Sequence, residues 1–127
     1  MTPVLGRIIL YSHNIPETAD FYCRLFGYSS VLQEGDGILE LRPAAQGLTL
    51  LLHPAAKGQK SGQVLLKLVF DVADVAGFCR QAAEFGVVFG PLHSARGYVF
   101  ANAKDPSGNS ISVSSRAFGQ PGGALTA

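Results

Sequence analysis

RIILYSHN at residues 7–14 and KLVFDVAD at residues 67–74 are two versions of one pattern, and this pattern decides the fold. Each version begins with a basic residue, continues as an apolar run, and ends on a residue type that caps helices. The two basic residues lie 60 positions apart in the chain, and so do the two final residues, Asn14 and Asp74. A fixed period of this kind indicates an internal duplication.

The first copy predicts a strand, a helix and three further strands. The helix begins after Asn14, carries an apolar stripe and ends at Gly27, a residue type that often follows the last helical turn. Glu17, three residues after Asn14, predicts a capping box. Turn-forming residues separate the expected strands, which lie at about 6–12, 28–34, 37–43 and 47–53.

The second copy begins after a polar connector at residues 54–63. Asp74 is expected to cap a second helix that ends before Gly86. The expected strands of this copy lie at about 64–72, 87–91, 97–103 and 109–115. The fold class is therefore α+β, with two tandem βαβββ modules. We expect one domain over 1–115, with modules at about 5–53 and 64–115, and a flexible tail over 116–127.

Composition limits the classes of function. The chain has 127 residues, 47% of them hydrophobic and 15% charged, which indicates a globular domain. The mean hydropathy of +0.23 suggests apolar surface that lines a pocket or is covered by a partner subunit. A net charge of +1, without a Lys/Arg run, gives no reason to expect nucleic acid as a partner.

The sequence also allows predictions about localisation and about the two cysteines. No apolar run reaches the length of a membrane span, and the N-terminal residues do not resemble a signal peptide, so we expect no membrane partner and a cytoplasmic protein. Cys23 and Cys79 fall in helical segments without metal-ligand spacing. They are expected to be buried, reduced thiols.

Three segments resemble the vicinal oxygen chelate superfamily, which contains glyoxalase I, bleomycin resistance proteins and extradiol dioxygenases. They are NIPETADFYCRLFGY at 14–28, FDVADV at 70–75 and KDPSGNSISV at 104–113. The resemblance implies that the two modules curve into a cupped mixed sheet, commonly within a homodimer. Asp105 and Gly108 of the DPSGN segment are interpreted as turn-forming residues.

The resemblance also implies four metal-ligand positions, mostly His and Glu in the metal-using members. Carried over to this chain, three of these positions fall on Arg7, Lys67 and Ser112. The fourth falls near Leu50, where the preceding loops vary in length. A divalent metal needs carboxylate, imidazole or thiolate ligands. Arg has only donors, Leu has no ligating atom, and two cations repel a metal. The sequence therefore predicts no metal at these positions.

Other histidines offer an alternative metal site. His13, His53 and His93 each lie at the end of a predicted element, and no two of them share a ligand-like spacing. Surface or hydrogen-bonded structural roles are favoured for all three. A site built from the three imidazoles stays open as an alternative.

Strand alternation predicts which side chains face the cup. Arg7 and Lys67 are expected to face it, unless they pair with Glu40 or Asp71 in a structural network. Tyr98 and Phe100 share a face, and they either line the pocket or fill core volume. The predicted ligand-binding residues are Arg7, Ile9, Tyr11, Leu50, Lys67, Val69, Tyr98, Phe100, Ser110, Ser112 and Ser114.

The absence of the usual ligands favours a metal-independent small-molecule binding protein without a cofactor, similar to the antibiotic-resistance members. Its ligand is expected to carry a negative group, because two cations in one pocket need a counter-charge. Two alternatives stay open. One is a metal-dependent lyase or isomerase, or a dioxygenase, with displaced ligands; the other is a structural dimer with a vestigial pocket. Whether the chain is an enzyme is left open.

The first prediction concerns the quaternary state. The high mean hydropathy and the family resemblance both predict a homodimer. Light scattering at micromolar concentration is expected to give about twice the chain mass of 13.4 kDa. A monomer at this concentration would contradict the prediction.

Overall fold

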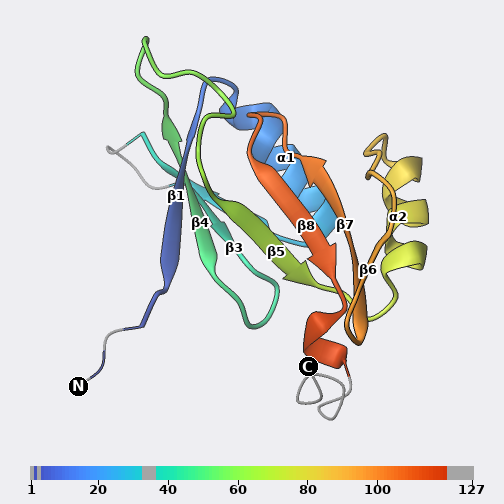
Figure 1. Ribbon diagram of the computed structural model, residues 1–127. Helices are drawn as coiled ribbons and strands as arrows, with labels where there is room; N and C mark the ends of the chain where they lie inside the picture. The colour runs from blue at the N-terminus through green and yellow to red at the C-terminus, as the bar shows by residue number, and fades with distance from the viewer. Residues whose placement is uncertain (1, 3, 33–36, 120–127) are drawn as a thin grey trace. The chain divides into compact units, whose positions relative to one another are not determined.

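The computed structural model describes residues 2, 4–32 and 37–119 (Figure 1). Its element order is the predicted one: strand, helix and three strands, followed by the same series again. The described residues form two compact units. Unit 1 takes the residues up to Gln63 together with Pro106–Gly108, and unit 2 takes Val64–Asp105 and the residues from Asn109 onward.

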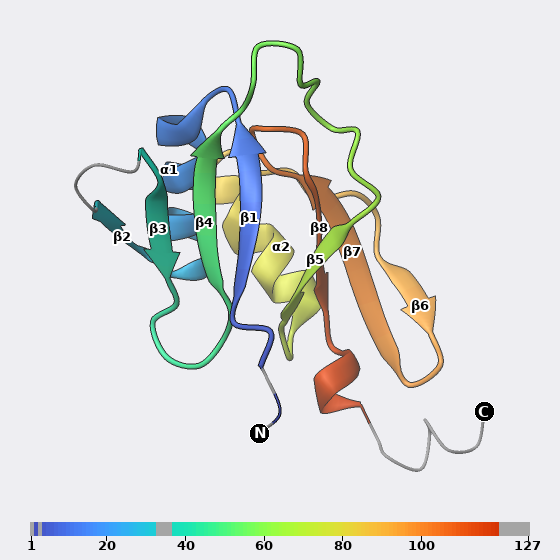
Figure 2. The same ribbon diagram turned by 90° about the vertical axis from the view of Figure 1, so that its left-hand side faces the viewer.

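Unit 1 is a four-stranded mixed sheet with one helix. The strands stand in the order β1-β4-β3-β2; β1 and β4 pair in parallel, and the other neighbours pair antiparallel. Figure 2 shows α1 behind β3 and β4. The elements are β1 (Arg7–Ser12), α1 (Ile15–Phe26), β2 (Ser29–Leu32), β3 (Leu39–Arg42) and β4 (Thr49–Pro54).

Unit 2 repeats this topology, with strand order β5-β8-β7-β6 and a parallel β5–β8 pair. The repeat confirms the duplication and the α+β class of two βαβββ modules. In Figure 1 the helix α2 lies alongside β7, which it contacts. The elements are β5 (Lys67–Asp71), α2 (Val75–Glu84), β6 (His93–Ala95), β7 (Tyr98–Lys104), β8 (Ser110–Ser114) and the short 3-10 helix η1 (Arg116–Phe118).

Each unit buries one face of its sheet beneath its helix. In unit 1, Leu41 and Leu52 are fully buried, as is Tyr22 of α1. In unit 2, Ile111 and Val113 of β8 are equally buried. Burying an aliphatic or aromatic side chain of this size contributes about 1.5–3 kcal/mol, so these alternate strand positions hold each helix against its sheet. The other face of each sheet carries no helix of its own unit, and we call it the open face.

The helix ends were predicted with mixed success. Asp74 caps α2 as expected, since its Oδ1 accepts a hydrogen bond of 3.0 Å from the Gly77 N–H. Gly27 ends α1 in the left-handed region at a φ of 72°. The predicted capping box at Asn14 and Glu17 is wrong, because the Asn14 side chain makes no capping bond.

One predicted strand is also wrong. The segment at 87–91 forms no strand, and the short β6 takes the predicted place beside β7. Phe89 instead packs edge-on against Phe78 of α2, with 6.2 Å between the ring centroids. Val88 of this segment is 81% exposed, and the Gly90 N–H donates one hydrogen bond of 2.8 Å to the Asn102 carbonyl of β7. Pro91, which has no N–H, follows directly.

Two further predicted segments extend beyond the described residues. The strand expected at 28–34 ends at Leu32, and residues 33–36 lie outside the described residues. The expected tail begins with η1, which is ordered 3-10 structure, while residues 120–127 lie outside the described residues. In the part of the chain that the structure describes, neither helix has the length and apolar character to cross a bilayer.

The turn before β8 is held by a buried cluster of hydroxyl groups. Ser107 Oγ lies 2.8 Å from Ser12 Oγ and 2.7 Å from Thr18 Oγ1. It also donates to Asn14 Oδ1 at 2.9 Å, which explains why Asn14 does not cap the helix. The three hydroxyl-bearing residues are at most 3% exposed. These bonds attach Pro106–Gly108 to the corner between β1 and α1 within unit 1.

The same turn confirms the role expected for its own residues. Asp105 Oδ1 accepts from the Asn109 N–H, and its Oδ2 accepts from Asn109 Nδ2, both at 2.8 Å. Gly108 has a φ of 85°, a conformation in which other residues are strained.

The hydroxyl cluster generates the second prediction. Ser107→Ala removes three side-chain hydrogen bonds from a buried site and leaves partner hydroxyls with fewer bonds. The free energy of unfolding is expected to fall by about 1–3 kcal/mol, measured by urea denaturation. The matched control is Ser94→Ala on the exposed strand β6, with an expected change within about 0.5 kcal/mol. Equal losses in the two variants would show that the cluster adds no stability.

Candidate functional site

The open face of unit 1 carries the predicted β1 residues. Ile9 and Tyr11 are 45% and 50% exposed, whereas Leu10 between them is 5% exposed. Arg7 is also exposed and shares the parity of Ile9 and Tyr11. The register places His53 opposite Tyr11, and their ring centroids are 5.2 Å apart. Alternation therefore places these residues on one face, as the sequence predicted.

Leu50 does not belong to this face. It lies opposite Ile8 in the register, packs on the α1 side and is 2% exposed. The residue on the open face is Leu51, which pairs with Ile9. Since Ser112 pairs with Val69, the equivalent of Ile9 in the second copy, Leu51 is the counterpart of Ser112. The sequence estimate was one residue off, and one residue reverses the face of a strand.

The open face of unit 2 carries the predicted residues of three neighbouring strands. Val69 of β5 is 57% exposed, and its β8 partner Ser112 pairs in turn with Asn102 of β7. Phe100 pairs with Ser114 and therefore shares this face. The predicted residues on the face are Lys67, Val69, Tyr98, Phe100, Ser110, Ser112 and Ser114.

The serines form the floor of this face rather than projecting from it. Ser112 and Ser114 are 3% and 5% exposed, although Val69 on the same face is 57% exposed. Ser112 Oγ donates to the Ala101 carbonyl at 3.1 Å, and Ser114 Oγ accepts from the Arg116 N–H at 3.1 Å. The hydroxyl proton of Ser112 is therefore already used within the protein.

Among the described residues, neither Arg7 nor Lys67 forms an ion pair with a carboxylate. Glu40 forms its salt bridge with Arg42, and Lys67 Nζ donates to Asn102 Oδ1 at 3.1 Å. Over the described ranges, no salt bridge joins Arg7 or Lys67 to an acidic side chain. The structural network considered for Glu40 and Asp71 is therefore not formed within the described chain.

The residues at the metal-ligand positions do not fit a divalent metal. With Leu51 in place of Leu50, the set is Arg7, Leu51, Lys67 and Ser112, which offers no carboxylate, imidazole or thiolate. Among the described residues, no group of three or more His, Cys, Asp or Glu side chains lies close enough to hold a metal ion.

The three histidines have separate local contacts. His13 Nε2 lies 2.6 Å from the Gln59 carbonyl oxygen, and His53 Nδ1 lies 2.8 Å from that of Pro54. His93 stacks on Phe100 with a centroid distance of 5.1 Å.

Both cysteines are half-buried rather than fully buried, and neither is in a disulfide. Burial raises the pKa of each thiol, and the Asp20 carboxylate raises the pKa of Cys23 further. A raised pKa keeps a thiol protonated at neutral pH and makes it a poor nucleophile.

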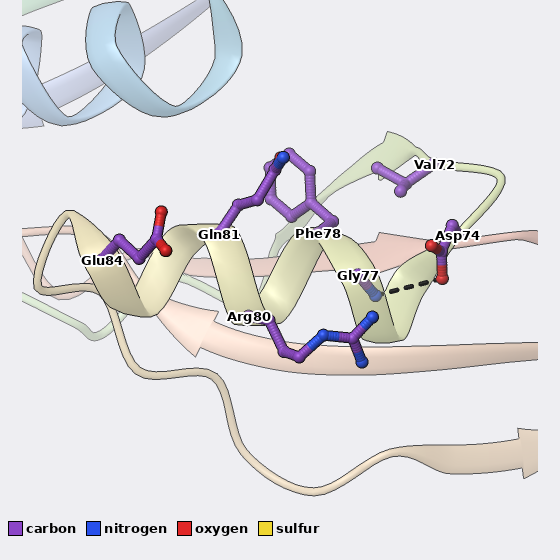
Figure 3. Close-up of a pocket in the computed structure, with 7 residues that line it drawn as sticks. All are labelled: Val72, Asp74, Gly77, Phe78, Arg80, Gln81 and Glu84. Atoms are coloured by element: carbon purple, nitrogen blue, oxygen red, sulfur yellow. Dashed lines mark hydrogen bonds between the residues drawn. The ribbon is translucent and has the colours of Figure 1, made fainter.

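A depression of about 620 Å³ beside α2 was not predicted from the sequence (Figure 3). In the figure Phe78 and Gln81 project from one side of the helix and Arg80 from the other. The Asp74 carboxylate in this depression is occupied by its capping bond. The lining is mostly helix surface, and its charged side chains are Asp74, Arg80 and Glu84. Its lining residues are Val72, Asp74, Gly77, Phe78, Arg80, Gln81 and Glu84.

Solved structures with the same fold include proteins of several activities. TnmS3, an antibiotic binding protein from Streptomyces sp. CB03234, is 22% identical with a TM-score of 0.74, over 88% of this chain and 94% of its own. Lactoylglutathione lyase from Agrobacterium tumefaciens is 20% identical with a TM-score of 0.67, over 89% and 93%. The oxidase ChaP-H2 is 19% identical with a TM-score of 0.72, over 91% and 95%.

At these identities the likeness shows the fold alone. No curated protein matches the chain. The family model described as Glyoxalase/Bleomycin resistance protein/Dioxygenase superfamily matches residues 4–113, which cover both βαβββ modules. Together with the repeated topology of the two units, this match shows that the chain belongs to the Glyoxalase/Bleomycin resistance protein/Dioxygenase superfamily.

Proposed function

We propose that the protein is a metal-independent binder of small molecules that carry a negative group. The observation behind the proposal is the chemistry of the four ligand positions, where Arg7 and Lys67 take the places of metal ligands. Neither cation is neutralised by a carboxylate of the described chain. A cation beside apolar surface attracts an anionic ligand group, and Arg can bind a carboxylate through two parallel hydrogen bonds.

The apolar body of the ligand has suitable surface next to each cation. Ile9 and Tyr11 lie on the same open face as Arg7, in unit 1, and Val69 lies on the same open face as Lys67, in unit 2. Small-molecule sites combine mostly apolar surface with a few polar groups in this way. The antibiotic-binding TnmS3 is an example of a binding protein with this fold.

An enzyme of the superfamily is the second candidate. The lyase and the oxidase share the fold with this chain about as closely as the antibiotic binding protein does. Fold likeness therefore does not separate the candidates, and the residues at the ligand positions decide the ranking. A structural dimer with a vestigial pocket would have no ligand at all.

The third prediction separates the binder from a metal enzyme. Protein dialysed against Zn²⁺, Ni²⁺, Mn²⁺ or Fe²⁺ and then washed is expected to retain far less than one metal per chain by elemental analysis, because the ligand positions lack suitable donors. Retention near one metal per chain, lost on replacing His13, His53 or His93, would favour an enzyme with displaced ligands.

The fourth prediction tests the charge of the ligand. A thermal-shift screen that compares carboxylic acids with their matched amides is expected to find stabilisation by the acids. Replacing the cation that binds the acid, by Arg7→Met or Lys67→Met, is expected to weaken binding by roughly thirtyfold or more, equivalent to about 2 kcal/mol or more.

The matched controls are Arg80→Met on α2 and Lys57→Met in the connector, where both side chains are exposed. Neither is expected to change the affinity for the acid. Equal stabilisation by acids and amides, with no effect of the Arg7 and Lys67 replacements, would contradict an anion-binding function.

A further inference from the structure

Four side chains of unit 2 lie next to one another in a row. The ring centroids of His93 and Phe100 are 5.1 Å apart, with 29° between their planes. Phe100 and Tyr98 are 6.3 Å apart with 37° between planes. The Arg116 guanidinium carbon lies 5.5 Å from the centroid of the Tyr98 ring, within the range of a cation–π interaction. We call these four residues the aromatic ladder.

The backbone places each member of the ladder. Tyr98 and Phe100 are two residues apart on β7 and so share its open face. The register of β6 places His93 directly opposite Phe100. Arg116 begins η1 immediately beyond β8, where its N–H donates to Ser114 Oγ and η1 contacts β7. Arg116 lies outside both the family match, which ends at residue 113, and the domain expected from the sequence.

The ladder is accessible and already ordered. His93 and Arg116 are exposed at its two ends, and Tyr98 and Phe100 are half-buried between them. Each side chain is held by its neighbour, so less side-chain freedom is lost when a ligand binds than on a flexible surface. Aromatic side chains favour planar ligand rings, which they contact in offset or edge-to-face geometry.

The charges near the ladder indicate the sign of the ligand. Among the described residues, the strand register and side-chain contacts place three basic residues, Lys67, Lys104 and Arg116, and one acidic residue, Asp71, on this open face. Lys67 and Lys104 each donate to a neutral side chain, at 3.1 and 2.8 Å. The excess of cations is complementary to an anion.

We propose that the aromatic ladder binds planar aromatic anions, with the ring system against Tyr98, Phe100 and His93 and the anionic group at Arg116. This inference rests on the proposed binding function and names its ligand class and one specificity-determining residue. Arg116 suits the role because its guanidinium lies over the Tyr98 ring and its planar set of N–H donors can bind a carboxylate. Lys67 would then be a secondary contact.

The proposal has an aromatic half, the contact of the ligand rings with the ladder, and an anionic half, the contact of the negative group with Arg116. Isothermal titration of the full chain with three probe compounds tests the two halves separately. 2-Naphthoate carries both an aromatic ring system and a negative charge, 2-naphthamide only the rings, and decalin-2-carboxylate only the charge. We expect 2-naphthoate to bind about tenfold more tightly than either of the others. Equal binding of 2-naphthoate and decalin-2-carboxylate would overturn the aromatic half.

Substitutions assign the binding to the ladder. Arg116→Met is expected to weaken 2-naphthoate binding about tenfold and to leave 2-naphthamide unchanged. Phe100→Leu is expected to weaken both compounds, and His93→Leu, at an exposed position, gives the same comparison if Phe100→Leu fails to fold. Arg80→Met on α2 is the matched control. Unchanged 2-naphthoate binding in Arg116→Met overturns the assignment of the anion to Arg116.

Failure of this inference and failure of the proposed function give different results. If 2-naphthoate does not bind but other acids stabilise the protein through Arg7 or Lys67, the ladder proposal is wrong and the anion-binding function stands. If neither acids nor amides bind in either experiment, both are wrong.

Discussion

The two-residue period of the strands, combined with one helix on one face of each sheet, controls where every candidate functional side chain lies. In β1, Leu10 is buried and Ile9 is exposed. In unit 2, Val113 of β8 lies on the buried face of the sheet, and Val69 of β5 lies on the open face. A slip of one residue in β1 would turn Arg7 toward α1 and bury an uncompensated charge, which costs several kcal/mol. The buried residues of β1 therefore determine that Arg7 lies on the open face.

The same constraint explains how much of the structure the sequence predicts. The duplication follows from the 60-residue spacing of the two patterns, and the Asp74 cap and the faces of Ile9, Tyr11 and Val69 follow from local periods within each copy. Leu50 was misplaced because the loops before β4 vary in length, and counting through a loop carries no information about register. Leu51 becomes identifiable only from its pairing with Ile9.

Other features depend on contacts between residues that are distant in the sequence. The apolar segment around Phe89 has the composition of a strand, and only its packing on Phe78 shows that it contacts a helix instead. Asn14 is a residue type that often caps helices, but its side-chain oxygen accepts a hydrogen bond from the Ser107 hydroxyl instead. Arg116 lies in a Gly-containing segment that predicts a tail, so nothing local indicates that it stacks on Tyr98.

Because of the hydroxyl cluster around Ser107, the first copy of the duplicated unit depends on residues of the second copy. In a strict tandem duplication, each unit would take all of its residues from one half of the chain. Here unit 1 includes Pro106–Gly108, which the chain supplies 43 residues after Gln63. During synthesis, the corner of Ser12 and Thr18 gains its last partner only when the turn before the final strand has emerged from the ribosome. Separated as an independent gene, the first half would lose the hydrogen bonds that the Ser107 hydroxyl makes to Ser12, Thr18 and Asn14.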